Sequence, residues 1–264
     1  MKNDTVTVFL GGDVFGAAGM AAATALLPSL IAEYSIDFTV INGENATAGT
    51  GISPQDAAAL FACGVDVITG GNHSFEKREF IPLLETDPRV LRPANYPHPC
   101  GRGDFEIEKN GIHWAVLNLQ GREFMPALDC PFRLARARID EWNAQAEPPL
   151  VLVDFHAESN EEKEALAFYL DGDISVLAGT HTHVQTADER VLPAGTAYQT
   201  DLGMTGPVLS VIGVDPVLAV KRNITQVLYR MEPAAGQVCL RGLVVSIDTT
   251  TRCALSVERI MRRL

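Results

Sequence analysis

The chain has 264 residues, of which 47% are hydrophobic, and it carries a formal net charge of −12. This length lies at the upper end for one compact domain and the apolar content suffices for a large core, so we expect a single domain over residues 1–264. The acidic excess argues against stable, sequence-independent binding of DNA or RNA, which relies on Lys and Arg to neutralise phosphates. A small phosphate ligand is not excluded, because a bound metal ion can override the global field.

The cysteines and the first residues of the chain indicate a cytoplasmic protein. Five cysteines, an odd number without Cys-x-x-Cys spacing, are typical of reduced thiols and not of a disulfide framework. Met1–Leu10 has one Lys, one Asp and only a short apolar run, so it does not resemble a signal peptide. We find no apolar run of membrane-spanning length and expect no membrane partner.

The first half of the chain alternates short apolar runs with helical patterns. Ser53 followed by Pro54 is typical of an N-cap with proline at the first helical position, and Gly64 follows as a stop. Strands separated by helices predict parallel β-α-β units. The predicted elements are strands at Val6–Leu10, Ile36–Ile41 and Val65–Thr69, and helices at Met20–Glu33 and Pro54–Cys63.

The second half adds a hairpin and more alternation of strand and helix. The turn Asn110-Gly111 joins predicted strands at Phe105–Glu108 and Ile112–Asn118. The mixture of elements predicts an α/β fold in which two sheets pack together with helices outside. The remaining predicted elements are helices at Leu134–Trp142 and Glu161–Leu170, and strands at Leu150–Phe155, Ile174–Ala178, Val191–Leu192, Thr196–Thr200 and Gln237–Ile247.

Polar side chains collect where the apolar strands stop. In open α/β sheets the ligand crevice lies outside the carboxyl ends of the strands. Taken singly, each such residue is more simply explained as a turn, cap, surface or core residue, and only their joint occurrence favours a site. Five strand ends supply two carboxylates, two amides and four of the six histidines: Asp13, then Glu44 and Asn45, then Asn72 and His73, then His156, then His181 and His183.

These residue types favour a pair of divalent metal ions. Imidazole nitrogen and carboxylate or amide oxygen suit Fe, Mn, Zn or Co, and the absence of cysteine argues against a structural zinc site. A carboxylate such as Glu44 can bridge two ions, and ions about 3.5–4 Å apart polarise phosphoryl oxygens and lower the pKa of water towards about 7. The glycine-rich stretch Gly11–Gly19 lacks the order of a dinucleotide or Walker loop.

The order of these motifs resembles that of the calcineurin-like metallophosphoesterases. The resemblance rests on Gly12-Asp13, Gly43-Glu44-Asn45, Gly71-Asn72-His73 and Gly179-Thr180-His181-Thr182-His183. Further segments, at 41–45, 91–96, 118–122, 154–158, 181–189 and 201–207, are similar to the YmdB-like branch in particular. The similarity spans Phe9 to about Ile260 and implies a four-layer α/β/β/α sandwich with two central mixed sheets.

The resemblance also implies a role for each candidate residue and an activity. Glu44 would bridge two divalent metal ions, iron being expected and manganese or zinc possible alternatives, and His73 would be the general acid. The implied activity is hydrolysis of a phosphodiester, in particular a 2′,3′-cyclic nucleotide, by a metal-bridging hydroxide, in a homo-oligomer (dimer or tetramer). The first metal would be held by Asp13, Glu44, Asn45 and His183, and the second completed by Asn72, His156 and His181.

Two alternatives to the phosphodiesterase stay open, and two positions depart from the wider pattern. The same metals would serve a phosphomonoesterase or nucleotidase, and a metal-binding regulatory module with incidental hydrolysis is the third hypothesis. Phe15 stands where many calcineurin-like enzymes have a histidine ligand. Ser74 stands where many have the acidic residue that orients the histidine, with Glu76 two positions on. Arg102 and Arg122 lie in loops and are candidates for contacting phosphate or for plain solvated surface.

Overall fold

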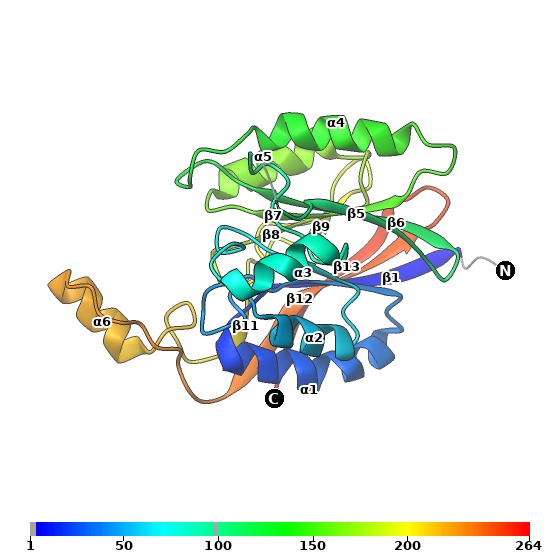
Figure 1. The fold of residues 1–264 in the computed structure, drawn as a ribbon. Coiled ribbons are helices and arrows are strands. Elements are labelled where there is room, and N and C mark those ends of the chain that lie inside the picture. The colour runs from blue at the N-terminus through cyan, green and yellow to red at the C-terminus, as the bar shows by residue number, and fades with distance from the viewer. Residues whose placement is uncertain (1–3, 98–99) are drawn as a thin grey trace.

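The computed structural model describes residues 4–97 and 100–264. Two mixed β-sheets stack face to face, and helices cover the outer face of each (Figure 1). This helix–sheet–sheet–helix order confirms the predicted four-layer α/β/β/α sandwich.

The first sheet has the strand order β2-β11-β12-β1-β3-β4, with β13 paired to β12. Strands β1, β3 and β4 run parallel, and β12 runs antiparallel to both β1 and β13. Helices α1 (Gly16–Tyr34) and α2 (Pro54–Ala62) cover its outer face (Figure 1). The strands are β1 (Thr5–Gly11), β2 (Asp13–Val14), β3 (Phe38–Asn42), β4 (Val67–Thr69), β11 (Met204–Pro207), β12 (Val238–Asp248) and β13 (Ala254–Arg263).

The second sheet has the strand order β5-β6-β7-β8-β10-β9, and its four inner strands run parallel. Helices α4 (Pro131–Asn143) and α5 (Asn160–Leu170) cover its outer face (Figure 1). The strands are β5 (Asp104–Lys109), β6 (Ile112–Gln120), β7 (Leu150–His156), β8 (Val176–Thr180), β9 (Arg190–Val191) and β10 (Ala197–Gln199). The short helices are η1 (Arg78–Phe80), α3 (Ile81–Thr86) and α6 (Pro216–Thr225).

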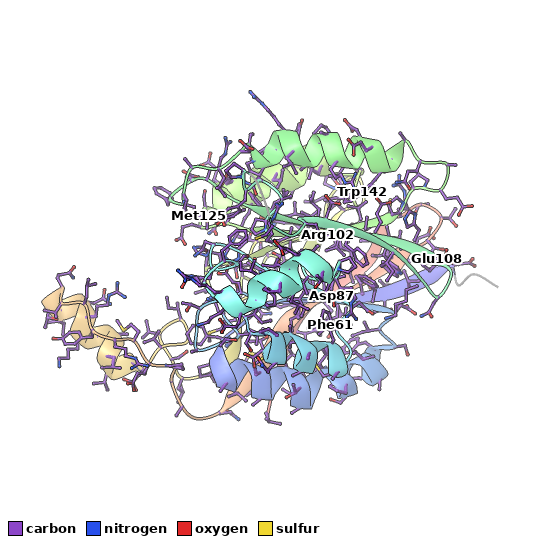
Figure 2. The ribbon with its side chains drawn as sticks, viewed as in Figure 1. Phe61, Asp87, Arg102, Glu108, Met125 and Trp142 are labelled. Carbon is purple, nitrogen blue, oxygen red and sulfur yellow. The ribbon has the colours of Figure 1, made fainter. Side chains whose placement is uncertain are left out.

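Three apolar layers hold the sandwich together. Between the sheets, Phe38 of β3 stacks on Trp114 of β6 with ring centroids 4.7 Å apart. Leu27 and Leu60 fill the layer under α1 and α2, and Trp142 lies in the opposite outer layer under α4 (Figure 2). Burial of this apolar surface is the main favourable term in folding.

Helix α1 departs from the expectation that no apolar run reaches membrane-spanning length. Of the described helices, it is the one long and apolar enough to cross a bilayer by length and composition. Its inner residues, Leu27 and Leu30 among them, pack against the first sheet, and the core helix of a globular domain satisfies the same criterion.

The predicted elements are all present, with ends that shift by up to four residues. Ser53 caps α2 as predicted, because its hydroxyl accepts a hydrogen bond from Asp56 N. The largest shift is at α1, which begins at Gly16 and not at Met20. The elements that were not predicted are β2, β11, β13, η1, α3 and α6.

Candidate metal centre

The candidate residues lie at the carboxyl edges of both sheets. His156 is the last residue of β7, and the backbone pairs it with Thr180, the last residue of β8. The first sheet supplies Asp13 from β2 and the loops after β3 and β4, which carry Glu44, Asn45, Asn72 and His73. Side chains from opposite halves of the chain therefore meet where the two sheets end together.

His156 lies at the middle of one group of polar atoms. Its Nε2 is 3.0 Å from Glu44 Oε1, 3.0 Å from Asn72 Oδ1 and 3.0 Å from His181 Nδ1. The His156 side chain is fully buried. Gly71 makes this approach possible, since a Cβ there would lie 2.2 Å from Glu44 Oε2 and 2.4 Å from His156 Nε2.

Asp13, Asn45 and His183 form a second group beside the first. His183 Nε2 lies 3.2 Å from Asn45 Oδ1. Asp13 is fully buried, and its Oδ2 accepts a hydrogen bond from His181 N at 3.1 Å. Its Oδ1 lies 3.7 Å from His156 Nδ1 and has no hydrogen-bond partner among the described residues. Such an orphaned buried carboxylate oxygen is costly unless a ligand completes it.

Each of the three histidines donates a hydrogen bond from the ring nitrogen that points away from the cluster. This outer hydrogen bond fixes the tautomer and the orientation of the ring. His156 Nδ1 donates to Thr180 Oγ1 (2.9 Å), whose own proton goes to Asp154. His181 Nε2 donates to the carboxylate of Glu158 at 3.1 Å. His183 Nδ1 donates to the carbonyl oxygen of Ile212 at 2.9 Å. The second ring nitrogen of each neutral imidazole is thereby left as a lone pair directed at the polar groups, the arrangement typical of metal-ligating histidines.

In the absence of a metal ion, burial and neighbouring charges shift the pKa values of His156, Glu44 and His181 strongly. Burial lowers the pKa of His156, but the carboxylate of Glu44, helped by Asp13, outweighs it and raises the value to about 9. Burial would raise the pKa of Glu44, yet the charge and hydrogen bond of His156 bring it to about 2. Burial and the charge of His156 lower the pKa of His181 to about 3.

These residues fit a divalent cation. Glu44, His156 and His181 each offer one ligand atom, and those atoms all lie within 4.8 Å of one another. Without an ion, a proton on His156 is what separates the facing acceptors, which is the reason for its raised pKa. One metal ion would take the place of that proton, and a second would complete the orphaned oxygen of Asp13.

The structure settles the two positions that departed from the wider pattern. His73 Nδ1 lies 2.9 Å from Glu76 Oε1, so Glu76 is the acidic partner of His73. Ser74 turns inward instead and donates to Gly71 O at 2.7 Å. Phe15 is buried and meets the His183 ring edge-to-face with centroids 5.6 Å apart. It thus supports a candidate ligand by packing where a histidine would coordinate.

The sequence analysis did not identify a buried hydrogen-bond network beneath the site, which is centred on Asp154. Asp154 accepts hydrogen bonds from Thr69 Oγ1, Thr180 Oγ1 and Asn42 Nδ2. It lies two positions before His156 on β7, so both side chains point to the same face of the strand. That spacing was a signal in the sequence which could have identified Asp154.

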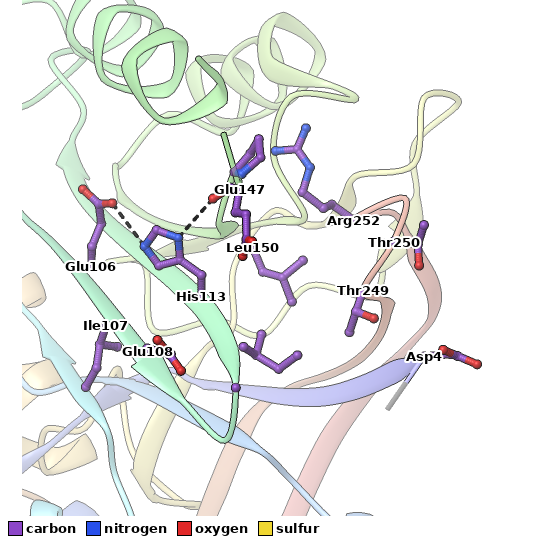
Figure 3. A pocket seen from close by; sticks show the side chains of 13 residues that line it. Asp4, Glu106, Ile107, Glu108, His113, Glu147, Leu150, Thr249, Thr250 and Arg252 are labelled. Carbon is purple, nitrogen blue, oxygen red and sulfur yellow. Dashed lines mark hydrogen bonds and ion pairs between the residues drawn. The ribbon is translucent and has the colours of Figure 1, made fainter. Parts of the chain in front are cut away.

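The two arginines that were candidates for contacting phosphate are both exposed. Arg122 is exposed, and its backbone N donates to Glu162 Oε2 at 3.0 Å. Arg102 is exposed, and its backbone forms an isolated β-bridge with Leu91. A cleft of about 740 Å³ lies at the opposite ends of the strands, where His113 contacts Glu106 and Glu147 (Figure 3).

A sandwich of two mixed sheets whose shared edge gathers histidines, carboxylates and amides is the arrangement of a metallophosphoesterase. The chain belongs to the YmdB-like protein family, whose model matches residues 9–260. This membership confirms the resemblance to the YmdB-like branch.

Three relatives are similar over nearly the whole chain. The 2′,3′-cyclic-nucleotide 2′-phosphodiesterase of Bacillus subtilis (strain 168) is 44% identical over 251 residues, 95% of this chain and 94% of that protein. A crystal structure described as a hypothetical protein from Thermus thermophilus is 36% identical with a TM-score of 0.91, and covers 98% of this chain and 99% of its own. One described as a novel phosphatase from Mycoplasma pneumoniae is 32% identical with a TM-score of 0.92, and covers 100% and 95%.

Proposed function

We propose that this chain is a metal-dependent phosphodiesterase that hydrolyses a 2′,3′-cyclic nucleotide or a closely related phosphodiester. The main supporting observation is that three histidines each use one ring nitrogen in an outer hydrogen bond and direct the other into a cluster that contains Glu44, Asn45 and Asn72. Family membership confirms the prediction of a phosphoester hydrolase. The name of the Bacillus subtilis relative supports the cyclic nucleotide as substrate.

The proposed cofactor is a pair of divalent ions, iron first, with manganese or zinc as alternatives. When bound, the ions would supply positive charge to the phosphoryl oxygens and lower the pKa of the attacking water. Glu44 would serve both ions, since its two oxygens face different neighbours. One ion would be held with Asp13, Asn45 and His183, and the other with Asn72, His156 and His181.

His73 is the proposed general acid. Glu76 accepts from its Nδ1, which leaves Nε2 to carry a proton to the leaving ribose oxygen. The backbone N of His73 donates to Glu44 Oε2 at 3.1 Å and so ties the acid to the metal ligands. The His73 side chain is 28% exposed and can therefore meet a substrate.

Phe75 and Tyr96 are the proposed contacts for the nucleobase. Phe75 follows His73 by two positions in the chain, and its ring meets that of Tyr96 edge-to-face with centroids 5.4 Å apart. Burial raises the pKa of the Tyr96 hydroxyl, its hydrogen bond to Gln120 lowers it, and the charge of Glu44 raises it, which means that Tyr96 is within electrostatic reach of a candidate ligand. Aromatic faces bind bases by stacking, with little preference for sequence.

We also make proposals on the domain organisation, the location, the assembly and the partners of the protein. We propose one domain over residues 1–264, action in the cytoplasm as a homo-oligomer, and a small nucleotide partner. Stable binding of nucleic acid and a membrane partner are not expected. The net charge of −12 supports the view that only the local field of bound cations attracts phosphate.

The test is metal analysis of anaerobically purified protein, followed by a phosphoester panel on the same sample. We expect two metal ions per chain and faster turnover of 2′,3′-cyclic AMP and bis-p-nitrophenyl phosphate than of p-nitrophenyl phosphate. His181→Ala should lose metal and turnover, while His113→Ala, at the far cleft, serves as the matched control.

Two outcomes would replace the proposal. Faster turnover of the monoester would identify a phosphomonoesterase, the activity that the description of the Mycoplasma pneumoniae relative favours. Bound metal without turnover of any phosphoester in the panel would identify a regulatory module.

A further inference from the structure

Residues 209–233, which we call the arm, project from the sandwich with α6 at their outer end (Figure 1). The base of the arm is held by backbone hydrogen bonds from Asp215 N to Glu232 O (2.9 Å) and from Ala234 N to Gly213 O (2.9 Å). Within α6 only Ala219 is buried. The arm is thus an ordered part of the chain that packs little of itself against its own sandwich.

The arm carries an unusual share of the exposed apolar surface. Of the 16 exposed large hydrophobic side chains in the described residues, eight lie on the arm. Val217, Val220 and Ile224 share one face of α6 and are 73%, 55% and 76% exposed, while Leu228 is 84% exposed. A gathered apolar patch of this kind marks an interaction surface, whereas scattered exposed residues do not.

The charge of the arm indicates what covers it. Between Pro216 and Met231 the arm has three cations, Lys221, Arg222 and Arg230, and no acidic residue. The base of the arm adds Asp215 and Glu232, so the arm has a net charge of +1 and the rest of the chain has −13, against −12 for the whole. Because the cations Lys221 and Arg222 lie on α6, the outer end of the arm would be attracted by a local acidic protein surface that also offers apolar side chains.

The sandwich offers an acidic surface with an apolar floor. A cleft of about 520 Å³, which we call the acidic cleft, lies beside the start of α5. Three carboxylates, Glu123, Glu161 and Glu162, line it beside one cation, Arg122, and Leu128 and Phe132 form its apolar part. The cleft matches the arm in both properties, because each combines apolar side chains with charge of opposite sign.

We propose that the arm docks on a second copy of this chain, with its apolar face against the acidic cleft and Lys221 and Arg222 beside Glu123 and Glu161. Reciprocal contacts of this kind close a symmetric assembly. The base of the arm also holds the candidate metal centre, since Ile212 O accepts the hydrogen bond from His183 Nδ1. Assembly and the position of this ligand are therefore linked through the arm.

The first experiment measures the mass of the full-length protein in solution by light scattering and sedimentation. We expect an oligomer that Ile224→Glu/Leu228→Glu dissociates, with a rise in the dissociation constant of at least about 30-fold. Leu255→Glu is the matched control, because Leu255 is 58% exposed on β13, away from the arm, and should leave the mass unchanged. Circular dichroism verifies that each variant is folded.

The second experiment reverses the charges. Lys221→Glu/Arg222→Glu should weaken assembly, and mixing that variant with Glu123→Lys/Glu161→Lys should restore it. Failure to restore would overturn the acidic cleft as the docking surface. A monomeric wild type, or an oligomer indifferent to the arm variants, would overturn the proposal altogether. A monomer that sediments with phosphatidylserine vesicles through the arm would overturn it in favour of a membrane.

Discussion

His73 is the residue whose role can be separated most cleanly from metal binding. It touches the candidate ligands only through its backbone N, so His73→Ala should keep both metal ions. We expect turnover to fall about 10²–10⁴-fold with a ribose leaving group, because loss of a general acid costs that much. The fall should be small with bis-p-nitrophenyl phosphate, whose leaving group needs no proton. Equal losses on both substrates would reject the role of His73.

Tyr96 tests whether the aromatic pair binds the base. Tyr96→Ala removes the ring that meets Phe75 and should raise KM for 2′,3′-cyclic AMP by about 5–100-fold, because base stacking is worth about 1–3 kcal/mol. Kinetics on bis-p-nitrophenyl phosphate, which has no base, are the control and should change little. Tyr96→Phe should behave like the wild type if stacking dominates. A general loss on both substrates would point to a structural role.

Asp154 acts through the residues it holds. Its carboxylate accepts the proton of Thr180, which in turn fixes His156 with Nε2 directed inward. Asp154→Asn should therefore weaken metal binding about 10–100-fold, the usual effect of losing an outer hydrogen-bond partner. Titration of the metal-free protein measures this, with Glu108→Gln on the surface as control. Unchanged affinity would show that Thr180 alone holds the ring.

The loop that carries His181 and His183 depends on a buried ion pair between two elements. Lys163 of α5 lies 2.7 Å from Asp201, both fully buried, and Asp201 also accepts from Thr182 N. Lys163→Met leaves a buried charge alone and should cost about 3–5 kcal/mol in the free energy of unfolding.

Denaturant unfolding of the metal-free protein measures this cost. Lys163→Met/Asp201→Asn should recover much of the loss, because no charge is then left unpaired. Lys109→Met breaks a partly exposed pair with Asp66 and should cost at most about 1 kcal/mol. A similar cost for Lys109→Met and Lys163→Met would contradict the importance of burial.

Elements with a buried face were predictable, and those without one were not. Strands such as β7 are wholly buried up to the site, so both the element and the polar residue that ends it stand out. The segment that forms β13 is mostly exposed and charged, and α6 is exposed along nearly its whole length. Neither shows the contrast between buried and solvent-facing positions on which prediction relies.

The same contrast explains what could be known of the site. Asp13, Glu44, Asn72 and the histidines each follow a strand within a short motif, so the sequence alone could group them. Glu158 and Ile212 contact His181 and His183 through positions that carry no such motif. Those partners depend on how the second sheet and the arm pack, which no local pattern records.

The two sheets meet at a cluster of hydrogen-bond acceptors that face one another, and a proton or a metal ion must lie between them. In the ion-free protein the proton on His156 performs this task, and its pKa is raised to about 9. A raised folded-state pKa contributes stability that is fully present below the ordinary value of about 6.5 and is lost as the pH rises through 9. The metal-free protein should therefore lose stability between about pH 6.5 and 9.

Bound metal should remove that dependence. A cation replaces the proton and binds more tightly as its ligands lose their protons, so metal should raise Tm more at about pH 9 than at about pH 6.5. Calorimetry of chelated and reloaded protein at both pH values measures the difference. His156→Gln is the control, because it has no ring to protonate and should flatten the alkaline loss in the metal-free protein. A Tm gain that is equal at both pH values would mean that the metal does not compete with the proton on His156.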